Sequence, residues 1–221
     1  MLIEPNSYLY SYAITRDFGF APNPFHGCCT LATCKPGIRK SANVNDWIMG
    51  IGGSNLKDTR RKCIFLMKVT KKISFQDYWD DTRYTLKKPV RNGSNVQMIG
   101  DNIYHQSIDG KWLQEDSHHS NSDGTPNHVN LKRDTGRCDQ VLVSNFFFYF
   151  GNKAIAVDLD SIGYSRVRDF KKTSLSDSEE GKKLIKLIYK ENRNNVNYII
   201  SDPCQFIDSH KRVDQDTGKI T

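Results

Sequence analysis

The chain has 221 residues, of which 37% are hydrophobic and 11% aromatic, and it carries a formal net charge of +7 with a mean hydropathy of -0.62. That length suits one domain with additions, or two small domains, and is enough to bury a hydrophobic core. No apolar run approaches the roughly 20 residues that cross a bilayer, and the start has no basic segment followed by an apolar one. These features argue against a membrane span and a secretory signal, so we predict a cytoplasmic protein with no membrane partner.

The first third of the chain alternates between strands and loops. Residues 7–15 alternate polar and apolar side chains and are rich in aromatics, which predicts a strand. Glycine and proline are dense in residues 18–40, which predicts an ordered loop with a short helical turn near residues 30–34. Residues 44–52 and 62–70 are apolar enough to predict two further strands.

The middle of the chain is first basic and then polar. The window from Lys57 to Arg91 holds eleven basic and four acidic residues, an excess equal to the net charge of the whole chain. Ser74 is a plausible N-cap of a short helix with Asp77 in its first turn. Residues 100–136 form a run of histidines, acids and turn residues that is longer than ordinary loops, and such connections tend to be functional or disordered.

The last third supplies more strands and the main helical signal. Residues 140–144 and 146–150 have strand character, and Gly151-Asn152 predicts a turn into a strand at 153–157. Residues 176–179 fit a capping box, an apolar stripe at helical spacing follows, and 196–200 resemble a strand. The pattern predicts an α+β fold with a small, strongly curved sheet or barrel and two or three helices. Neither a dinucleotide-binding glycine motif nor a Walker loop is present.

The polar run contains groups suited to acid–base chemistry. His105, His118 and His119 could work with a carboxylate such as Asp101 or Asp116, because imidazole titrates near neutral pH. The alternative is that these side chains cap turns and bond to the backbone of an irregular loop. We take all five residues as candidate catalytic groups.

Aromatic and polar side chains could bind a base. Base–aromatic stacking contributes roughly 1–3 kcal/mol per base, and Trp47, Trp112 and Tyr104 are candidates, although core packing is the alternative, above all for Trp47. Asn23 and His26 are candidates for contacts to the polar edge of a base.

The basic window supplies four candidate phosphate or nucleic-acid contacts, which are Arg60, Arg61, Lys87 and Lys88. The alternative for these cations is a solvated sheet edge that lysines protect from pairing with another chain.

The cysteines leave several alternatives open. In a cytosolic chain six thiols are expected to be reduced. His26, Cys28, Cys29 and Cys34 cluster, which raises the possibility of zinc, but no Cys-x-x-Cys pair occurs, so we predict no metal and no cofactor. A cysteine nucleophile beside His26 is conceivable, but the spacing singles out no one thiol.

Seven segments together resemble a known family. They are residues 10–12 (YSY), 17–27 (DFGFAPNPFHG), 29–36 (CTLATCKP), 46–50 (DWIMG), 78–81 (YWDD), 100–105 (GDNIYH) and 116–120 (DSHHS). In this order they resemble the second of the nucleotide-modification-associated domain families of bacteria and phages, over about residues 7–151. Asp202-Pro203-Cys204 departs from the ending expected there. The order of strands is also similar to PUA-like barrels, including the EVE and ASCH groups, which hold modified bases or RNA.

These resemblances imply a PUA-like mixed β-barrel with flanking helices. We expect a domain over residues 1–160, a helix and strand packing on it over 161–206, and a polar tail over 207–221. The predicted function is recognition of a nucleotide or modified nucleic-acid base, in a DNA-modification or phage-defence context, in a pocket formed by loops 18–35 and 100–136. The alternatives are a hydrolase or transferase acting on a nucleotide or nucleic acid through His and Asp groups, and a small protein whose basic face contacts a partner.

Overall fold

A computed structural model describes residues 1–165 and 169–212. Within those residues a seven-stranded main sheet contains β1 (Tyr8–Ile14), β3 (Trp47–Gly52), β4 (Lys62–Lys68), β9 (Phe147–Tyr149), β10 (Ile155–Ala156), β11 (Lys171–Ser174) and β12 (Tyr198–Ile199). The strand order is β11-β1-β3-β4-β9-β12, and β10 pairs with β4. Strands β1 and β3 run parallel, as do β9 and β12, whereas the other pairs are antiparallel.

A second sheet continues from the main one through two short bends. It consists of β2 (Cys29–Leu31), β8 (Gln140–Ser144) and β5 (Lys71–Ser74), in the order β2-β8-β5. Strand β4 leads into β5 and β8 leads into β9, and the bond from Thr70 N to Val143 O, 2.8 Å, carries backbone pairing across the bend. A separate hairpin pairs β6 (Tyr104–Gln106) with β7 (Trp112–Gln114).

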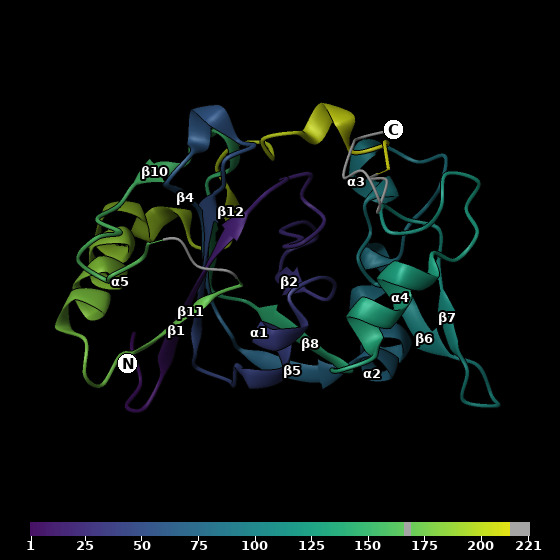
Figure 1. The fold of residues 1–221 in the computed structure, drawn as a ribbon, viewed down its shortest axis with the longest axis horizontal. Helices are drawn as coiled ribbons and strands as arrows, with labels where there is room; N and C mark the ends of the chain where they lie inside the picture. Colours follow the sequence, from purple (N-terminus) through teal and green to yellow (C-terminus); the bar gives the residue numbers. More distant parts are fainter. Residues whose placement is uncertain (166–168, 213–221) are drawn as a thin grey trace.

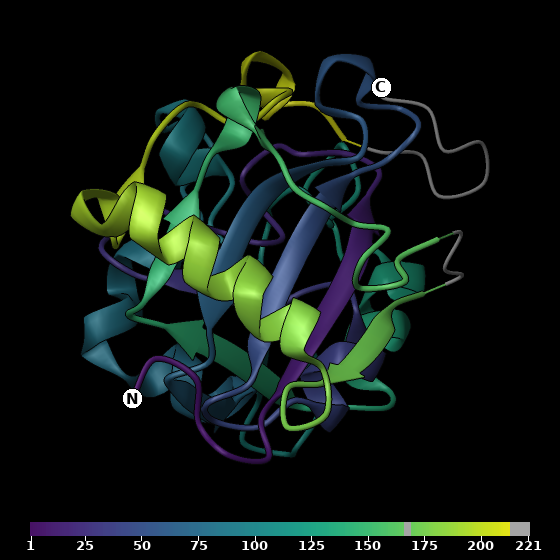
Figure 2. The ribbon, with the colours of Figure 1, turned by 90° about the vertical axis from the view of Figure 1, so that its left-hand side faces the viewer.

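Short helices surround these sheets. They are α1 (Pro36–Ser41), α2 (Phe75–Asp80), α3 (Asn95–Met98), α4 (His128–Thr135) and α5 (Glu179–Asn192), with 3-10 turns at Lys57–Thr59, Thr82–Lys87, Gly151–Lys153, Arg193–Asn195 and Phe206–Asp208. Helix α5 crosses one face of the main sheet (Figure 2). Helix α4 and the β6–β7 hairpin lie at the opposite end of the molecule, with α1, β2 and β8 between (Figure 1).

The main sheet is covered on both faces, which explains its nearly continuous apolar sequence. Leu9, Trp47 and Leu66 pack with the apolar stripe of α5 on one face. Tyr10, Ile48 and other side chains from alternate positions pack on the second face against α1 and β8. Strand β11 pairs with β1 and β12 with β9, so the segment after residue 160 packs onto the same core.

The predicted α+β class is confirmed, but the described strands do not close into a barrel. Strands β11 and β12 remain the edges of the main sheet, and β2 and β5 remain the edges of the second sheet. The chain passes from one sheet to the other where β4 leads into β5 and where β8 leads into β9. The observed architecture is therefore a pair of sheets joined at a bend.

Two of the predicted helix starts can be compared with the structure. Ser74 caps α2, and Asp77 completes a capping box, as the sequence predicts. The cap of α5 is Ser178, which accepts from Gly181 N at 3.0 Å, two residues later than the predicted capping box. The run 100–136, which the sequence predicts as a loop, contains the β6–β7 hairpin and α4. Residues 213–221 of the predicted tail lie outside the described residues.

A buried lysine fixes the loop between β1 and β2. The Lys87 ammonium, 1% exposed, donates to Asn23 O at 2.9 Å, Asn23 Oδ1 at 2.8 Å and Cys28 O at 2.9 Å, and it lies 3.2 Å from Thr30 Oγ1. Thr30 Oγ1 in turn donates to the buried Asp101 carboxylate at 2.5 Å. Asp101 supplies the opposite charge that a buried ammonium requires.

Replacing Lys87 by methionine should therefore lower the free energy of unfolding by about 3–5 kcal/mol, because Asp101 and several backbone oxygens lose their buried cation. Chemical denaturation followed by circular dichroism measures this change. The matched control is Lys88→Met, since Lys88 is half-buried and lies 3.7 Å over the Trp79 ring; its cost should stay near 1 kcal/mol. Equal losses in the two variants would contradict the structural role of Lys87.

Candidate functional site

A cavity of about 200 Å³ opens between two segments that are far apart in the sequence. Phe18, Phe20 and Cys34 line one side, and His118 and His119 line the other. Arg16, just after β1, and Arg133, in α4, also line the cavity. We call this cavity the Cys34 pocket. Both loops that the sequence singles out, 18–35 and 100–136, contribute to it.

The backbone presents Cys34 in an unusual conformation. Cys34 and Lys35 both have positive φ, 56° and 38°, which is uncommon for residues other than glycine. Cys34 N donates to Asp134 Oδ1 at 2.9 Å, and Arg39 Nε donates to Cys34 O at 2.8 Å. These tertiary contacts hold the turn and aim the partly exposed thiol at the pocket.

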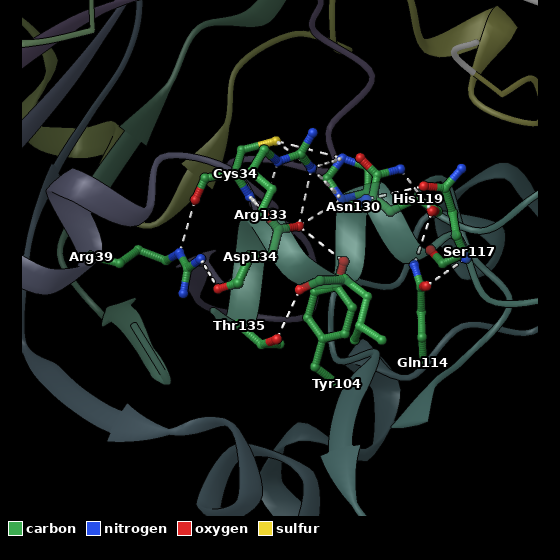
Figure 3. A network of polar contacts seen from close by, with 12 residues as sticks. Cys34, Arg39, Tyr104, Gln114, Ser117, His119, Asn130, Arg133, Asp134 and Thr135 are labelled. Carbon is green, nitrogen blue, oxygen red and sulfur yellow. Dashed lines mark hydrogen bonds and ion pairs between the residues drawn. The ribbon is translucent and has the colours of Figure 1, made fainter. Parts of the chain in front are cut away.

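A chain of polar contacts runs from Cys34 through His119 to Asp134 (Figure 3). Cys34 Sγ lies 3.5 Å from His119 Nε2, and His119 Nδ1 lies 2.9 Å from Asp134 Oδ2. Tyr104 OH donates to the same carboxylate oxygen at 2.9 Å. A nucleophile, a base and a group that orients the base in this order match the arrangement of cysteine-dependent enzymes.

Neighbouring amides fix the position of His119. Gln114 Nε2 and Asn130 Nδ2 each donate to the His119 carbonyl at 2.9 Å. The Asn127 side chain caps α4, because its Oδ1 accepts from Asn130 N at 3.0 Å. The backbone N–H of Asn127 donates to Gln114 Oε1 at 2.8 Å. The hairpin, the 116–120 loop and α4 are thus joined around one histidine.

The charges of the cluster favour a thiolate. Burial alone would raise the pKa of the Cys34 thiol, but the nearby charges of His119 and Arg133 outweigh it and hold that pKa below its ordinary value. Burial likewise opposes the charge on His119, yet Cys34 and Asp134 raise its pKa. At Asp134 the charges of His119 and Arg133 outweigh burial and lower the pKa of the carboxyl group.

Arg133 balances this cluster. Its Nε donates to Asp134 Oδ1 at 3.0 Å, and its Nη2 lies 3.9 Å from Cys34 Sγ and 3.1 Å from His119 Nδ1. Two cations so close together would repel each other unless the thiolate and the carboxylate were both ionised. The four groups then sum to zero charge, which lowers the cost of placing ions in a largely buried site.

His118 occupies a different environment from its neighbour. It packs against Phe18 with ring centroids 4.4 Å apart, and burial together with the charges of His119 and Arg212 lowers its pKa to about 3. A backbone hydrogen bond joins it to Lys211, while its Nδ1 is buried without a partner among the described residues. His118 is therefore a neutral side chain at the pocket wall, and its Nδ1 is buried.

The segment 202–212 braces the pocket from outside, and we call it the C-terminal strap. The buried Asp17 carboxylate accepts from Cys204 N at 3.0 Å and from the Tyr149 hydroxyl. Farther along, Arg212 Nη2 lies 3.1 Å from Asp116 Oδ1, beside the 116–119 wall. The strap therefore connects the β1–β2 loop to the opposite wall.

Only some of the candidate acid–base residues meet in one place. His118 and His119 line the pocket, whereas His105 stacks on Trp79 at 3.9 Å and pairs with Glu115 at 2.8 Å on the hairpin. Asp101 is fully buried beneath Thr30, and Asp116 forms ion pairs with Arg91 and Arg212. The carboxylate that orients His119 is Asp134, which the sequence analysis does not propose.

The candidate base-binding residues lie mostly in the core. Tyr104 belongs to the cluster through Asp134, but Trp47 is fully buried in the main sheet, where it is not available to stack on a ligand. Trp112 packs on Phe75, Asn23 is 1% exposed and accepts from Lys87, and His26 is exposed. The histidine beside Cys34 is His119, and not His26, the neighbour that the sequence offers.

The candidate phosphate contacts are dispersed. Lys87 is buried by its hydrogen bonds and is not available to a phosphate. Arg60 and Arg61 are exposed in the turn before β4, where Arg61 pairs with Asp160 at 2.7 Å, and Lys88 lies over Trp79. The basic window thus does not form one surface around the pocket.

Neither a cluster of metal ligands nor a membrane-spanning helix occurs in the part of the chain that the structure describes. No group of three or more His, Cys, Asp or Glu side chains is placed to hold a metal ion there. No helix in residues 1–165 and 169–212 has both the length and the apolar composition needed to cross a membrane.

Comparison with protein families gives one match. The model of nucleotide modification associated domain 2 matches residues 6–210, which include the pocket, α4, α5 and most of the strap. The chain belongs to this family. The match extends past the region 7–151 in which the sequence segments resemble the family, and it includes α5 and β12. No curated protein and no solved structure matches the chain.

The first prediction from this site concerns the reactivity of Cys34. Because its pKa is lowered, Cys34 should react with iodoacetamide at a lower pH than an ordinary thiol does, ahead of Cys28, Cys29, Cys63 and Cys204, whose pKa values are raised mainly by burial. Peptide mass spectrometry after timed alkylation from pH 5 to 9 gives the midpoint for each thiol.

The variant His119→Ala should shift the Cys34 midpoint to higher pH, because it removes the cation beside the thiolate. His105→Ala is the matched control, since His105 lies on the hairpin and not in the pocket. In this variant the Cys34 midpoint should equal that of the parent protein. An ordinary midpoint for Cys34, or no shift in His119→Ala, would refute the ion pair.

The second prediction concerns stability in acid. The pKa of His118 is about 3 in the folded chain and about 6.5 in an unfolded one, so between these values the unfolded state binds more protons. Stability is therefore lost as pH falls, by about 2 kcal/mol at pH 5 for this residue alone. His118→Gln, which does not titrate, should flatten the curve of unfolding free energy against pH. Parallel curves for His118→Gln and the parent would rule the effect out.

Proposed function

We propose that the protein is a cysteine-dependent hydrolase or transferase that acts on a group carried by a nucleotide or nucleic-acid base. Family membership supports a role in nucleotide modification. The observation that carries the enzymatic part is the chain of contacts from Cys34 through His119 to Asp134 at the wall of an open pocket. Buried structural thiols, in contrast, have raised pKa values and no such partner.

The chemistry follows from the positions of these groups. The Cys34 thiolate attacks the carbonyl carbon of an amide or ester, a C–S bond forms, and the carbonyl electron pair moves to oxygen. When that pair returns, the C–N or C–O bond breaks, and protonated His119 gives its proton to the departing amine or alcohol. Water or an amine then attacks the thioester, His119 accepts a proton, and the thiolate leaves.

The surrounding side chains have supporting roles. Asp134 holds the His119 ring with Nε2 toward sulfur and stabilises its cation. Arg133, within 3.9 Å of the sulfur, is near enough to stabilise negative charge that develops on the carbonyl oxygen. Asp134 and Tyr104 are positioning residues, because neither faces the pocket.

A second candidate is recognition of a modified base without chemistry, in a DNA-modification or phage-defence setting. It is favoured by the aromatic side chains Phe18 and Phe20 and by the neutral His118 at the pocket wall. It gives no account of a thiol with a lowered pKa.

Turnover distinguishes the two candidates. The protein is incubated with oligonucleotides that carry amide-linked or ester-linked groups on a pyrimidine, and nucleosides and intact protein are analysed by mass spectrometry. An enzyme should change the nucleoside mass and form an adduct on Cys34. Cys34→Ser should abolish the change and His119→Ala should slow it about 10²–10⁴-fold.

Cys204→Ser is the control, because Cys204 is also partly exposed but its pKa is raised to about 12. It should keep full turnover. If the nucleosides and the protein stay unchanged while Cys34→Ser binds the oligonucleotides as well as the parent does, the enzyme proposal fails and recognition is favoured.

A further inference from the structure

A second, larger cavity lies directly beside the Cys34 pocket. It has a volume of about 650 Å³ and is lined by His128, Val129, Lys132, Arg133 and Arg137, with Pro36. Arg133 lines both cavities, and Pro36 follows Cys34 by two residues. We call this cavity the α4 groove, because four of its seven lining residues belong to α4.

The α4 groove is suited to negative charge. Its lining contains three Lys or Arg residues and no carboxylate among the residues described. Asp134, the carboxylate within α4, is fully buried and faces the cluster instead. Lys132 and Arg137 form no ion pair within residues 1–165 and 169–212, so their charges are not neutralised by the protein there.

The two cavities differ in size, so they suit different parts of one substrate. The Cys34 pocket, at about 200 Å³, is smaller than the roughly 300–1,000 Å³ that drug-sized ligands occupy. It suits a base or a base substituent but not a complete nucleotide with its sugar and phosphates. The remainder of a bound nucleotide must lie outside, and the adjoining cationic surface is the α4 groove.

The geometry points to a binding site for single-stranded DNA, in which the α4 groove holds the sugar–phosphate backbone while one base enters the Cys34 pocket. This inference rests on the proposed action on a base. Pro36 and the exposed Val129 offer apolar contact to deoxyribose, and the lining has no carboxylate or amide side chain to accept a hydrogen bond from a ribose 2′-hydroxyl. We therefore commit to DNA as the occupant.

Two further considerations favour a strand over a free nucleotide. Helix α4 has eight residues and is about 12 Å long, a span that faces more than one phosphate of a strand. A base within a duplex must first be unstacked and rotated outward to reach a pocket, whereas a single strand offers its bases without that cost.

Binding is measured by fluorescence anisotropy with a labelled 12-nucleotide single-stranded DNA, from 50 to 300 mM salt. All proteins carry Cys34→Ser, which prevents chemistry. The double variant Lys132→Ala/Arg137→Ala should raise Kd about tenfold or more and should reduce the slope of log K against log salt by about 1.4, since each lost phosphate contact contributes about 0.7 for single strands.

The control is Lys186→Ala/Lys190→Ala, which removes two exposed lysines from α5 at the other end of the molecule. It loses the same charge and should bind like the parent. Lys132→Glu, a single exposed change, should weaken binding without lowering the melting temperature. Equal losses in the groove and control variants, or no loss in either, would overturn the site.

Competitors complete the test. If unlabelled RNA of the same sequence binds as tightly as the DNA, the commitment to DNA is overturned. If a deoxynucleoside monophosphate competes as well as the DNA strand does, the inference that the groove binds a strand is overturned. Weak competition by both supports the inference. If the groove variants bind like the control while the protein with Cys34 intact still changes the nucleoside mass, the groove fails and the proposed chemistry stands.

Discussion

The buried carboxylate of Asp134 is the interaction on which the site depends. It accepts from Cys34 N, His119 Nδ1, Arg133 Nε and Tyr104 OH, and it is fully excluded from solvent. An ion in such a place is tolerated only when charged and hydrogen-bonding partners surround it. Its partners come from the turn before α1, from β6, from the 116–120 loop and from α4, so one carboxylate gathers the segments that build the pocket.

The chain contains a second buried ionic cluster, around Lys87 and Asp101. Both clusters join the β1–β2 region to later segments and both satisfy their charges internally. Only the Asp134 cluster borders an open cavity and includes a nucleophile. Burial with paired charge is thus common to a structural and a reactive cluster, and access from solvent separates them.

The sequence predicts the regular parts of the fold well. Alternation and apolar runs indicate β1, β3 and β4, and the stripe at 184–188 indicates α5, because these signals depend on neighbouring residues. The polar segment 100–136 and the breaker-rich segment 18–35 are also recognisable as connections, but the first contains the β6–β7 hairpin and α4, and the second contains β2. His118 and His119 stand out by composition alone.

The partners within the site could not be predicted in the same way. Cys34 lies 85 residues from His119 and 100 residues from Asp134, and no local pattern connects them. Arg133-Asp134 is an ordinary pair of charges on a short polar helix until its environment is known. The charge count that indicates a basic window also cannot tell that Lys87 is buried while Arg60 is exposed, since that depends on tertiary packing.

The C-terminal strap has a practical consequence for handling the protein. Arg212 holds to Asp116 beside the pocket, whereas Met1 lies near Leu175 and Lys186, close to α5 at the other end of the molecule. A tag or linker inserted within the strap, between Cys204 and Arg212, would therefore lie beside the pocket and obstruct entry. Attachment at the amino end keeps that approach open, and removal of the strap would take away the brace between the two walls.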